Sequence, residues 1–335
     1  MALPRLVISA RKELFESFFS PWAVKRLDRA FAWERVGTSY ITREFRKRVQ
    51  GAEALITTWD SPTFAADLRQ SAPSLRIISH CGGEVKSRFA RPLFDSLTIT
   101  NAAGPMARAT AEMGAAMLLY CARNVDFYRA ALRKKSNLIY EQVHLHGAPE
   151  SITGGTVAMI GFGRIGRALV DLLRGFNLNW RVHDPYADRG LARKYPVKFV
   201  SLRDLLPKAH LLVLSAALTE ETRGILGKEN LAALPDGTAI INIARGGLID
   251  LMALRREVRS GRLRCALDVT DPTEPLAVDD PLRTIPGSII TPHIAGSGHH
   301  VRHEIARVVL DDLERFFKGN RVRNRVTAAM LDRMT

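Results

Sequence analysis

Three polar signatures in the second half of the sequence lie at the ends of apolar runs that are typical of buried strands. The first contains Arg245, the second contains Asp268 with Glu274 on the following loop, and the third contains His293. In an open sheet of parallel strands, ligands bind at the carboxyl ends of the strands. The sequence therefore predicts that an arginine, a carboxylate and a histidine meet at one edge of a sheet.

These three groups can reduce a 2-keto acid if a nicotinamide ring lies beside them. The guanidinium of Arg245 can hold the substrate carboxylate in a two-pronged contact and polarise the carbonyl group. A protonated His293 can give a proton to the carbonyl oxygen as hydride reaches the carbon. A neighbouring carboxylate stabilises the protonated ring and fixes its tautomer.

A glycine-rich turn predicts the dinucleotide that this chemistry needs. An apolar run at 156–160 is followed by Gly161, Gly163 and Gly166, which match the pattern G-x-G-x-x-G. The first glycine makes a tight turn, the second lets the backbone approach the pyrophosphate, and the third lets helix and strand pack closely. The amides of Arg164 and Ile165 begin a helix whose positive end faces the phosphates.

Asp184 indicates which dinucleotide binds. It ends the second predicted strand of this unit, about twenty residues after the glycines. A carboxylate there accepts hydrogen bonds from a ribose 2′-hydroxyl and repels a 2′-phosphate. The sequence favours NAD over NADP, although Arg181 and Arg189 lie close enough to argue for a phosphate.

From residue 151 the sequence alternates strands and helices, which predicts a parallel sheet covered on both faces. The predicted strands are 156–160, 180–183, 197–200, 210–214, 238–243, 264–268 and 288–291, with helices such as 201–206 and 250–260 between them. The first hundred residues show a looser pattern, with strands at 6–9, 54–57, 75–79 and 97–100 and helices at 11–19 and 62–70. We expect an α/β protein with two doubly wound parallel-sheet domains. One is a Rossmann cofactor domain and the other a flavodoxin-like substrate domain.

The expected boundaries make the chain cross between domains twice. Residues 1–102 and 298–335 form the substrate domain, because the last helix, at about 301–318, returns to the first domain. Residues 103–297 form the NAD-binding domain. A single long helix is predicted at 107–134, followed by a loop at 135–154. That helix is apolar enough to lie in the core or against a second subunit, and we favour the subunit, hence a homodimer.

Composition excludes several other classes of protein. The net charge of +15 is spread along the chain, without interleaved aromatic residues or a nucleic-acid-binding motif, so we expect no nucleic acid partner. No apolar window approaches the length of a membrane span, and the N-terminal apolar run is too short for a signal peptide. Three scattered cysteines indicate a reduced, cytoplasmic setting, and His299, His300 and His303 lack the spacing of a metal site, so we expect no metal.

Taken together, the motifs resemble those of the D-isomer-specific 2-hydroxyacid dehydrogenases, a family that includes phosphoglycerate, glycerate/hydroxypyruvate and D-lactate dehydrogenases. The resemblance runs from about residue 75 to 320. Its motifs are Ala-Thr-Ala-Glu-Met (109–113), Gly-Phe-Gly-Arg-Ile-Gly (161–166), Leu-Thr-Glu-Glu-Thr-Arg-Gly (218–224), Asn-Ile-Ala-Arg-Gly-Gly-Leu-Ile-Asp (242–250), Ala-Leu-Asp-Val (266–269) and Thr-Pro-His-Ile-Ala-Gly (291–296).

The resemblance implies roles for individual residues. Arg245, Glu274 and His293 would be the catalytic set, and Asp268 would lie near the nicotinamide carboxamide. The remaining cofactor contacts would come from Thr110 and from the backbone of 243–245 and 293–296, which includes Ile243, Ala244, Arg245, His293 and Gly296. The substrate would be a 2-keto or 2-hydroxy acid, bound where the substrate domain closes on the cofactor domain.

Two departures from the family pattern leave alternatives open. Glu274 follows Asp268 by six residues where the family usually has five, so either Glu274, which we favour, or Asp271 partners His293. The substrate loop contains Gly82 and Gly83, whose amides can bind a carboxylate, in place of the usual Gly-x-Gly-x-Asp. Lys86 either meets a second anionic group of the substrate or is a solvated surface lysine.

A second class of function also fits the same motifs. Corepressor relatives of these dehydrogenases keep the fold, the cofactor and the Arg/Glu/His set, and act as NAD(H)-sensing binding proteins. Turnover of a 2-keto acid with NADH distinguishes an enzyme from such a protein.

Overall fold

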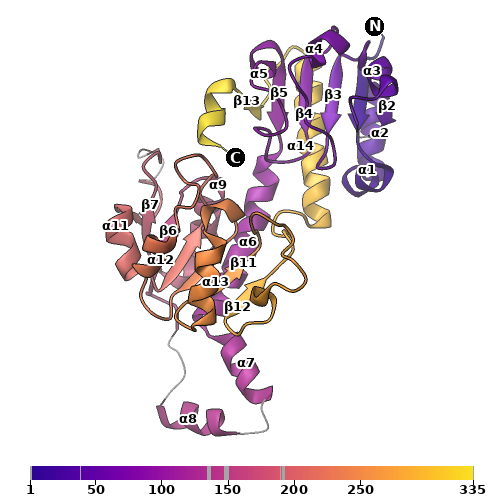
Figure 1. The fold of residues 1–335 in the computed structure, drawn as a ribbon. Coiled ribbons are helices and arrows are strands. Elements are labelled where there is room, and N and C mark those ends of the chain that lie inside the picture. The colour runs from indigo at the N-terminus through magenta and orange to yellow at the C-terminus, as the bar shows by residue number, and fades with distance from the viewer. Residues whose placement is uncertain are drawn as a thin grey trace. The chain divides into compact units, whose positions relative to one another are not determined.

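The structure is a computed structural model that describes residues 2–37, 39–133, 137–146, 151–188, 190 and 193–334. The chain forms two compact units. Unit 1 contains Met1–Met106 and Ser297–Thr335, and unit 2 contains Ala107–Gly296. Each unit is built on its own sheet (Figure 1).

The sheet of unit 1 has the strand order β13-β5-β4-β3-β1-β2. Its five parallel strands are β1 (Arg5–Ser9), β2 (Ala32–Val36), β3 (Ala54–Thr57), β4 (Ile77–His80) and β5 (Thr98–Asn101). The short β13 (Arg325–Val326) adds an antiparallel edge beside β5. It was not predicted from the sequence, and it brings the end of the chain back to the first domain.

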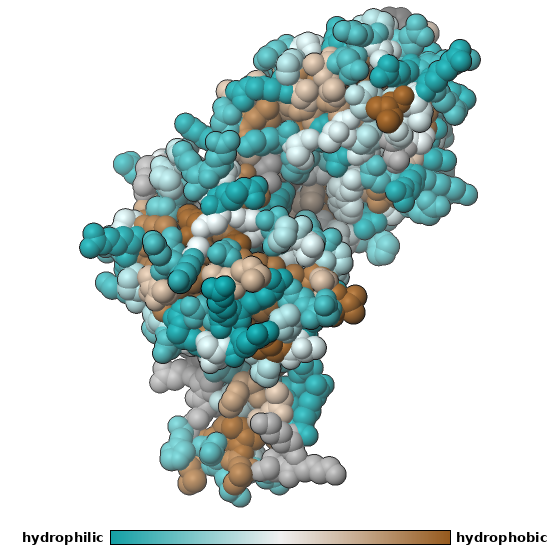
Figure 2. All heavy atoms as spheres, viewed as in Figure 1, coloured by the Kyte–Doolittle hydropathy of each residue, from teal (hydrophilic) through white to brown (hydrophobic). Residues whose placement is uncertain are grey.

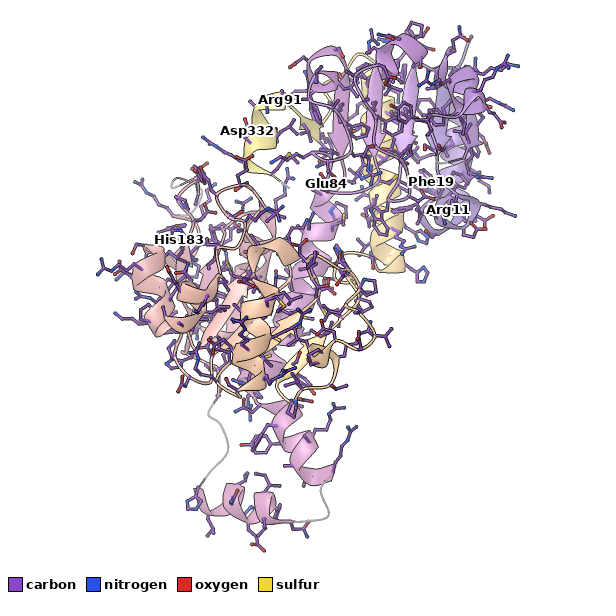
Figure 3. All side chains as sticks on the ribbon, in the orientation of Figure 1. Arg11, Phe19, Glu84, Arg91, His183 and Asp332 are labelled. Carbon is purple, nitrogen blue, oxygen red and sulfur yellow. The ribbon has the colours of Figure 1, made fainter. Side chains whose placement is uncertain are left out.

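Helices cover both faces of this sheet because successive side chains of a strand point to opposite faces. Leu6 and Ile8 of β1 face a core shared with α1 (Lys12–Phe18), α2 (Pro21–Ala30) and α14 (His299–Phe317). Val7 faces the other core, which α3 (Arg43–Val49), α4 (Leu68–Ser71) and α5 (Leu93–Ser96) help to close. The final turn, η5 (Ala328–Arg333), is tied down by the ion pair of Asp332 with Arg91 at 2.8 Å (Figure 3).

The sheet of unit 2 has the order β12-β11-β10-β9-β6-β7-β8, and all its strands are parallel. The strands are β6 (Thr156–Ile160), β7 (Asn179–His183), β8 (Val197–Phe199), β9 (Leu211–Leu214), β10 (Ala239–Asn242), β11 (Arg264–Leu267) and β12 (Ser288–Ile290). The chain builds outward from β6 in one direction and then, from β9, in the other. The point where the order reverses is where a doubly wound sheet binds its ligand.

Two cores flank this second sheet, so the doubly wound α/β fold predicted from the sequence is confirmed. Val157 and Met159 of β6 face the core that α6 (Ala103–Ala122) and α9 (Arg164–Leu172) cover. Ala158 and Ile160 face the core of α12 (Lys228–Ala232) and α13 (Leu251–Arg259). Shorter helical turns complete the unit: α11 (Leu202–Leu205), η1 (Arg174–Phe176), η2 (Leu206–Lys208), η3 (Gly246–Leu248) and η4 (Pro281–Arg283).

The prediction of one helix at 107–134 followed by a loop was wrong. The helix is interrupted after α6, where Asn124 has a φ of 49°, a left-handed conformation that ends a helix. The chain continues as α7 (Val125–Arg133) and α8 (Leu138–His146), so a helix lies inside the predicted loop. Neither α7 nor α8 buries a residue.

Other elements of unit 1 also differ from the sequence prediction. The helix predicted at 62–70 is only the short α4, and α2, β2 and α3 were not predicted. Among the described residues, no helix is long and apolar enough to span a membrane.

Candidate active site

The glycine turn at the end of β6 has a geometry that only glycine permits. Gly161 has a φ of 89°, and a Cβ built on it would lie 2.4 Å from the Cα of Ala216. The hydroxyl of Ser215, at the end of β9, donates to the carbonyl of Gly161 at 2.7 Å. Two neighbouring strands therefore fix the tight turn.

The helix that follows presents an open N-terminus. α9 begins at Arg164, and a Cβ on Gly163 would meet no atom within 4 Å. Gly166 is close-packed instead, since a Cβ there would lie 2.9 Å from the sulfur of Met159. Exposed backbone amides at a helix start, with space beside them, fit the pyrophosphate of a dinucleotide.

Asp184 lies directly after β7 and is oriented by the glycine turn. Its carboxylate accepts from the amide of Phe162 at 2.7 Å and from the amide of Tyr186 at 2.9 Å. These bonds hold the carboxylate at the carboxyl end of β7, directly after His183, which Figure 3 labels. Of the two arginines that argued for a phosphate, Arg181 donates to the carbonyl of Asp204 at 3.3 Å. Arg189 lies outside the described residues.

A buried amide shapes the turn that carries Arg245. Asn242, fully buried at the end of β10, donates to the carbonyl of Arg245 at 2.9 Å and accepts from the amide of Ala244 at 3.1 Å. Ile243 and Ala244 are buried, so their contribution to a ligand site is limited to the backbone. Arg245 itself is half-buried, and its guanidinium donates to the carbonyl of Ala244 at 2.7 Å.

Asp268 follows β11 and is 1% exposed, and both of its carboxylate oxygens accept hydrogen bonds. They accept from the Thr291 hydroxyl at 2.6 Å and from the amides of Ile294 and Ala295 at 2.9 and 3.0 Å. Its carbonyl accepts from the amide of His293 at 2.9 Å. Every donor belongs to the turn 291–295, which contains His293. Asp268, which the resemblance places near the cofactor, therefore holds this turn in place.

His293 and Glu274 are brought together by this arrangement. The histidine has a φ of 54°, and its Nδ1 lies 3.0 Å from Oε2 of Glu274. Their side chains are 46% and 36% exposed, so both are open to solvent on this edge. With Nδ1 engaged by the carboxylate, Nε2 is the nitrogen that can meet a substrate. Asp271, the alternative partner, instead pairs with Arg223 at 3.9 Å.

The predicted substrate loop belongs to unit 1, and one of its two amides is already used. The amide of Gly82 donates to the carbonyl of His80 at 2.8 Å. Of the two amides predicted to bind a substrate carboxylate, the amide of Gly83 is therefore the remaining candidate. His80 is buried and its Nδ1 is 2.9 Å from the Thr57 hydroxyl. Burial, and after it the charge of Arg88, lowers the pKa of His80 to about 3, so its ring is neutral at physiological pH.

The structure also describes the surroundings of three other sequence candidates, Cys81, Thr110 and Lys86. Cys81 is buried, and this burial raises the pKa of its thiol well above the ordinary value, so it is no nucleophile at neutral pH. Thr110 is buried on α6. Lys86 is exposed. In the part of the chain that the structure describes, no group of three or more His, Cys, Asp and Glu side chains is arranged to hold a metal ion.

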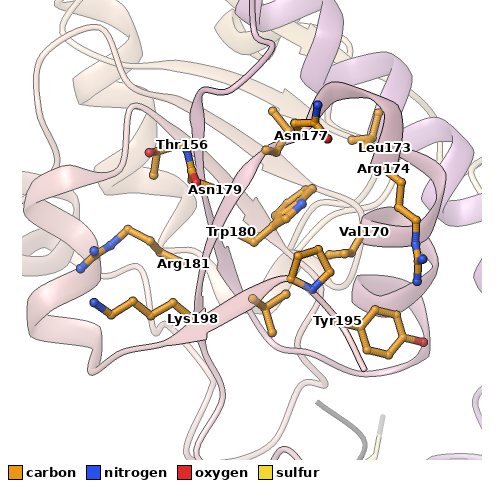
Figure 4. Close-up of a pocket in the computed structure, with 13 residues that line it drawn as sticks. Thr156, Val170, Leu173, Arg174, Asn177, Asn179, Trp180, Arg181, Tyr195 and Lys198 are labelled. Atoms are coloured by element: carbon orange, nitrogen blue, oxygen red, sulfur yellow. The ribbon is translucent and has the colours of Figure 1, made fainter. Parts of the chain in front are cut away.

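A cavity of about 650 Å³ lies away from these residues. It is lined by the first residues of β6, β7 and β8 and by the end of α9, including Thr156, Asn179 and Val197 (Figure 4). Those are the amino ends of the strands, whereas the glycine turn, Asp184 and His293 follow the carboxyl ends. The cavity is therefore no part of the candidate active site.

Sequence reasoning missed the polar residues that hold the site together. Ser215 and Asn242 are buried polar side chains at strand ends. Ser215 donates to the carbonyl of Gly161 in the glycine turn, and Asn242 donates to the carbonyl of Arg245. The signal was present, because a polar residue that closes an apolar strand is costly to bury unless it has a partner.

Comparison with known proteins identifies the family of this arrangement. Residues 115–295 match the family described as "D-isomer specific 2-hydroxyacid dehydrogenase, NAD binding domain". A D-3-phosphoglycerate dehydrogenase from Archaeoglobus fulgidus is 27% identical over 89% of this chain and 55% of its own length. A glyoxylate reductase from Korarchaeum cryptofilum is 28% identical, over 82% of each chain.

A solved structure is similar over both units. The crystal structure of a phosphoglycerate oxidoreductase from Rhizobium etli has a TM-score of 0.78 and 26% identity, covering 96% of this chain and 98% of that one. The chain spans about half the length of the phosphoglycerate dehydrogenases it matches, 55% and 54% in two of them.

Proposed function

The chain belongs to the D-isomer specific 2-hydroxyacid dehydrogenase family, and on that premise we propose that it is an NAD-dependent dehydrogenase. It interconverts a 2-keto acid and the corresponding D-2-hydroxy acid. The observation that carries the proposal is the His293–Glu274 contact of 3.0 Å at the carboxyl edge of the NAD-binding sheet. The relatives named above are dehydrogenases and reductases, so the alternative of a corepressor-like NAD(H)-sensing protein gains no support from them.

The proposed mechanism assigns one task to each side chain. NADH, when bound, supplies the hydride. Arg245 holds the substrate carboxylate and turns the carbonyl oxygen toward the histidine. The protonated His293 gives the proton on Nε2 to that oxygen, while Glu274 stabilises the positive ring through Nδ1. In the reverse direction the neutral ring takes the proton back.

The glycine turn and Asp184 hold the cofactor in this proposal. The amides at the start of α9 meet the pyrophosphate, and the fixed carboxylate of Asp184 accepts from the ribose hydroxyl. The three cysteines are buried free thiols, which agrees with the proposed cytoplasmic setting.

We also propose a homodimer that pairs through α7 and α8. Six large apolar side chains on these two helices are 40% to 77% exposed, and Figure 2 shows apolar surface in this region (Val125, Phe127, Leu132, Leu138, Tyr140 and Leu145). Monomeric proteins rarely leave so many large apolar side chains of one region exposed to water. A second copy covers it with the same residues, because a twofold interface is self-complementary.

The test of the proposed activity is NADH oxidation with a panel of short 2-keto acids, followed by absorbance. We expect turnover with at least one member. Arg245→Ala should then lower kcat/KM by about 10²- to 10³-fold, because two charge-assisted hydrogen bonds to the carboxylate are lost. NADH affinity, measured by fluorescence, should stay within about twofold, because backbone amides hold the cofactor. Tight NADH binding by the wild type without turnover of any keto acid would contradict the proposal.

Cofactor choice tests the role of Asp184. NADH should bind at least about tenfold more tightly than NADPH, a difference of about 1.4 kcal/mol. Asp184→Ala should narrow that gap, because the repulsion of the 2′-phosphate is removed. The two dissociation constants are measured by calorimetry, with Asp188→Ala, a nearby exposed acid, as the control. Equal affinities in the wild type would show that Asp184 does not select the cofactor.

Sedimentation equilibrium tests the dimer. The wild type should be dimeric at micromolar concentration, and Phe127→Asp should raise the dimer dissociation constant by at least about 30-fold, because a buried aromatic contact contributes about 2 kcal/mol or more. Val278→Asp is the matched control, since Val278 is 87% exposed but lies outside α7 and α8. A monomeric wild type, or equal effects of the two substitutions, would defeat this interface.

A further inference from the structure

The loop that carries Glu274 is one residue longer than the family pattern, and Thr270 lies at its start. Thr270 is 9% exposed and directly follows the turn of Asp268 and Val269. Its amide and its hydroxyl both donate hydrogen bonds to residues of the loop itself.

Two hydrogen bonds from Thr270 define the shape of that loop. Its hydroxyl donates to the carbonyl of Thr273 at 2.7 Å, which closes a four-residue turn around the extra residue. Its amide donates to Oε1 of Glu274 at 3.2 Å. One carboxylate oxygen is thereby fixed, and the other, Oε2, faces His293 at 3.0 Å.

The other side of Thr270 contacts the arginine turn. A Cβ built on Gly246 would lie 2.1 Å from the carbonyl carbon of Thr270 and 2.6 Å from the amide nitrogen of Asp271. The peptide bond between Thr270 and Asp271 therefore rests directly on the glycine that follows Arg245. The same short segment contacts the arginine turn and positions the carboxylate.

We infer that Thr270 is a positioning residue for the proton donor: its hydroxyl holds the lengthened loop in the conformation that directs Glu274 at His293. Without that bond the 273–274 peptide is free to move, and the carboxylate spends less time on Nδ1. The other carboxylates near the ring keep their own partners. Asp268 stays bound to the 294 and 295 amides, and Asp271 stays paired with Arg223.

The inference rests on the proposed dehydrogenase function, and its test uses three variants of the full chain. Thr270→Val keeps the shape and the amide but removes the hydroxyl. Thr270→Ser keeps the hydroxyl and removes the methyl group. Thr273→Ala is the matched control, because only the carbonyl of that residue accepts the bond and its side chain is exposed.

For keto-acid reduction we expect Thr270→Val to lower kcat by about fivefold, the effect of one lost hydrogen bond, and to leave the KM for the keto acid within about twofold. Its pH optimum should move to lower pH, because the protonated ring loses part of its carboxylate partner. Thr270→Ser and Thr273→Ala should keep the wild-type profile.

An unchanged pH profile in Thr270→Val would overturn the inference, and so would the same shift in Thr270→Ser, which would trace the effect to packing of the methyl group. If Thr270→Val fails to fold, the same comparison is made between Thr270→Ala and Thr270→Ser. The proposed function is tested separately by turnover of the wild type. If no keto acid is turned over, NMR titration of the His293 ring in each variant still reports whether the carboxylate is in place, and a titration unaffected by loss of the hydroxyl contradicts the inference.

Discussion

The candidate site depends on the hydrogen bonds that the buried carboxylate of Asp268 accepts. A charge that is 1% exposed is tolerated only when donors replace its water, and here the Thr291 hydroxyl and the amides of Ile294 and Ala295 do so. These donors come from the turn after β12, whereas the acceptor follows β11. These hydrogen bonds therefore fix the left-handed conformation of His293 and join the ends of two neighbouring strands, β11 and β12. Removing the carboxylate leaves these three donors without their acceptor and the turn without support.

The sequence predicts those strands whose hydrophobic pattern comes from burial on both faces of the sheet. The central strands β6, β9 and β10 of unit 2 are largely buried apolar runs, and the G-x-G-x-x-G turn and Arg245 follow the ends of two of them. β2 escaped prediction because it is an edge strand with the sequence Ala-Trp-Glu-Arg-Val and no fully buried residue. The break between α6 and α7 depends on the single left-handed residue Asn124, which hydrophobic periodicity does not reveal. Use of the Gly82 amide by His80 likewise depends on a local turn that residue types alone do not specify.

The lengthened loop illustrates the limit of spacing as a guide. Counting residues from Asp268 leaves two acids as partners for the histidine, because a loop accommodates an extra residue at small cost. Their contacts differ: Glu274 accepts a hydrogen bond from the Thr270 amide and lies 3.0 Å from His293, whereas Asp271 forms an ion pair with Arg223 at 3.9 Å. Position along the chain is therefore a weaker predictor of a catalytic partner than the donors that surround each carboxylate.

The central claim is that Glu274 stabilises the protonated His293 during keto-acid reduction, and the pH profile of kcat/KM tests it most directly. The profile is measured for the wild type, Glu274→Gln and Asp271→Asn. The account predicts that Glu274→Gln moves the optimum to lower pH, because the ring without a carboxylate partner is protonated only there, and that Asp271→Asn leaves it in place. A shift in Asp271→Asn with an unchanged Glu274→Gln would contradict the account, and so would two unchanged profiles with His293→Ala inactive.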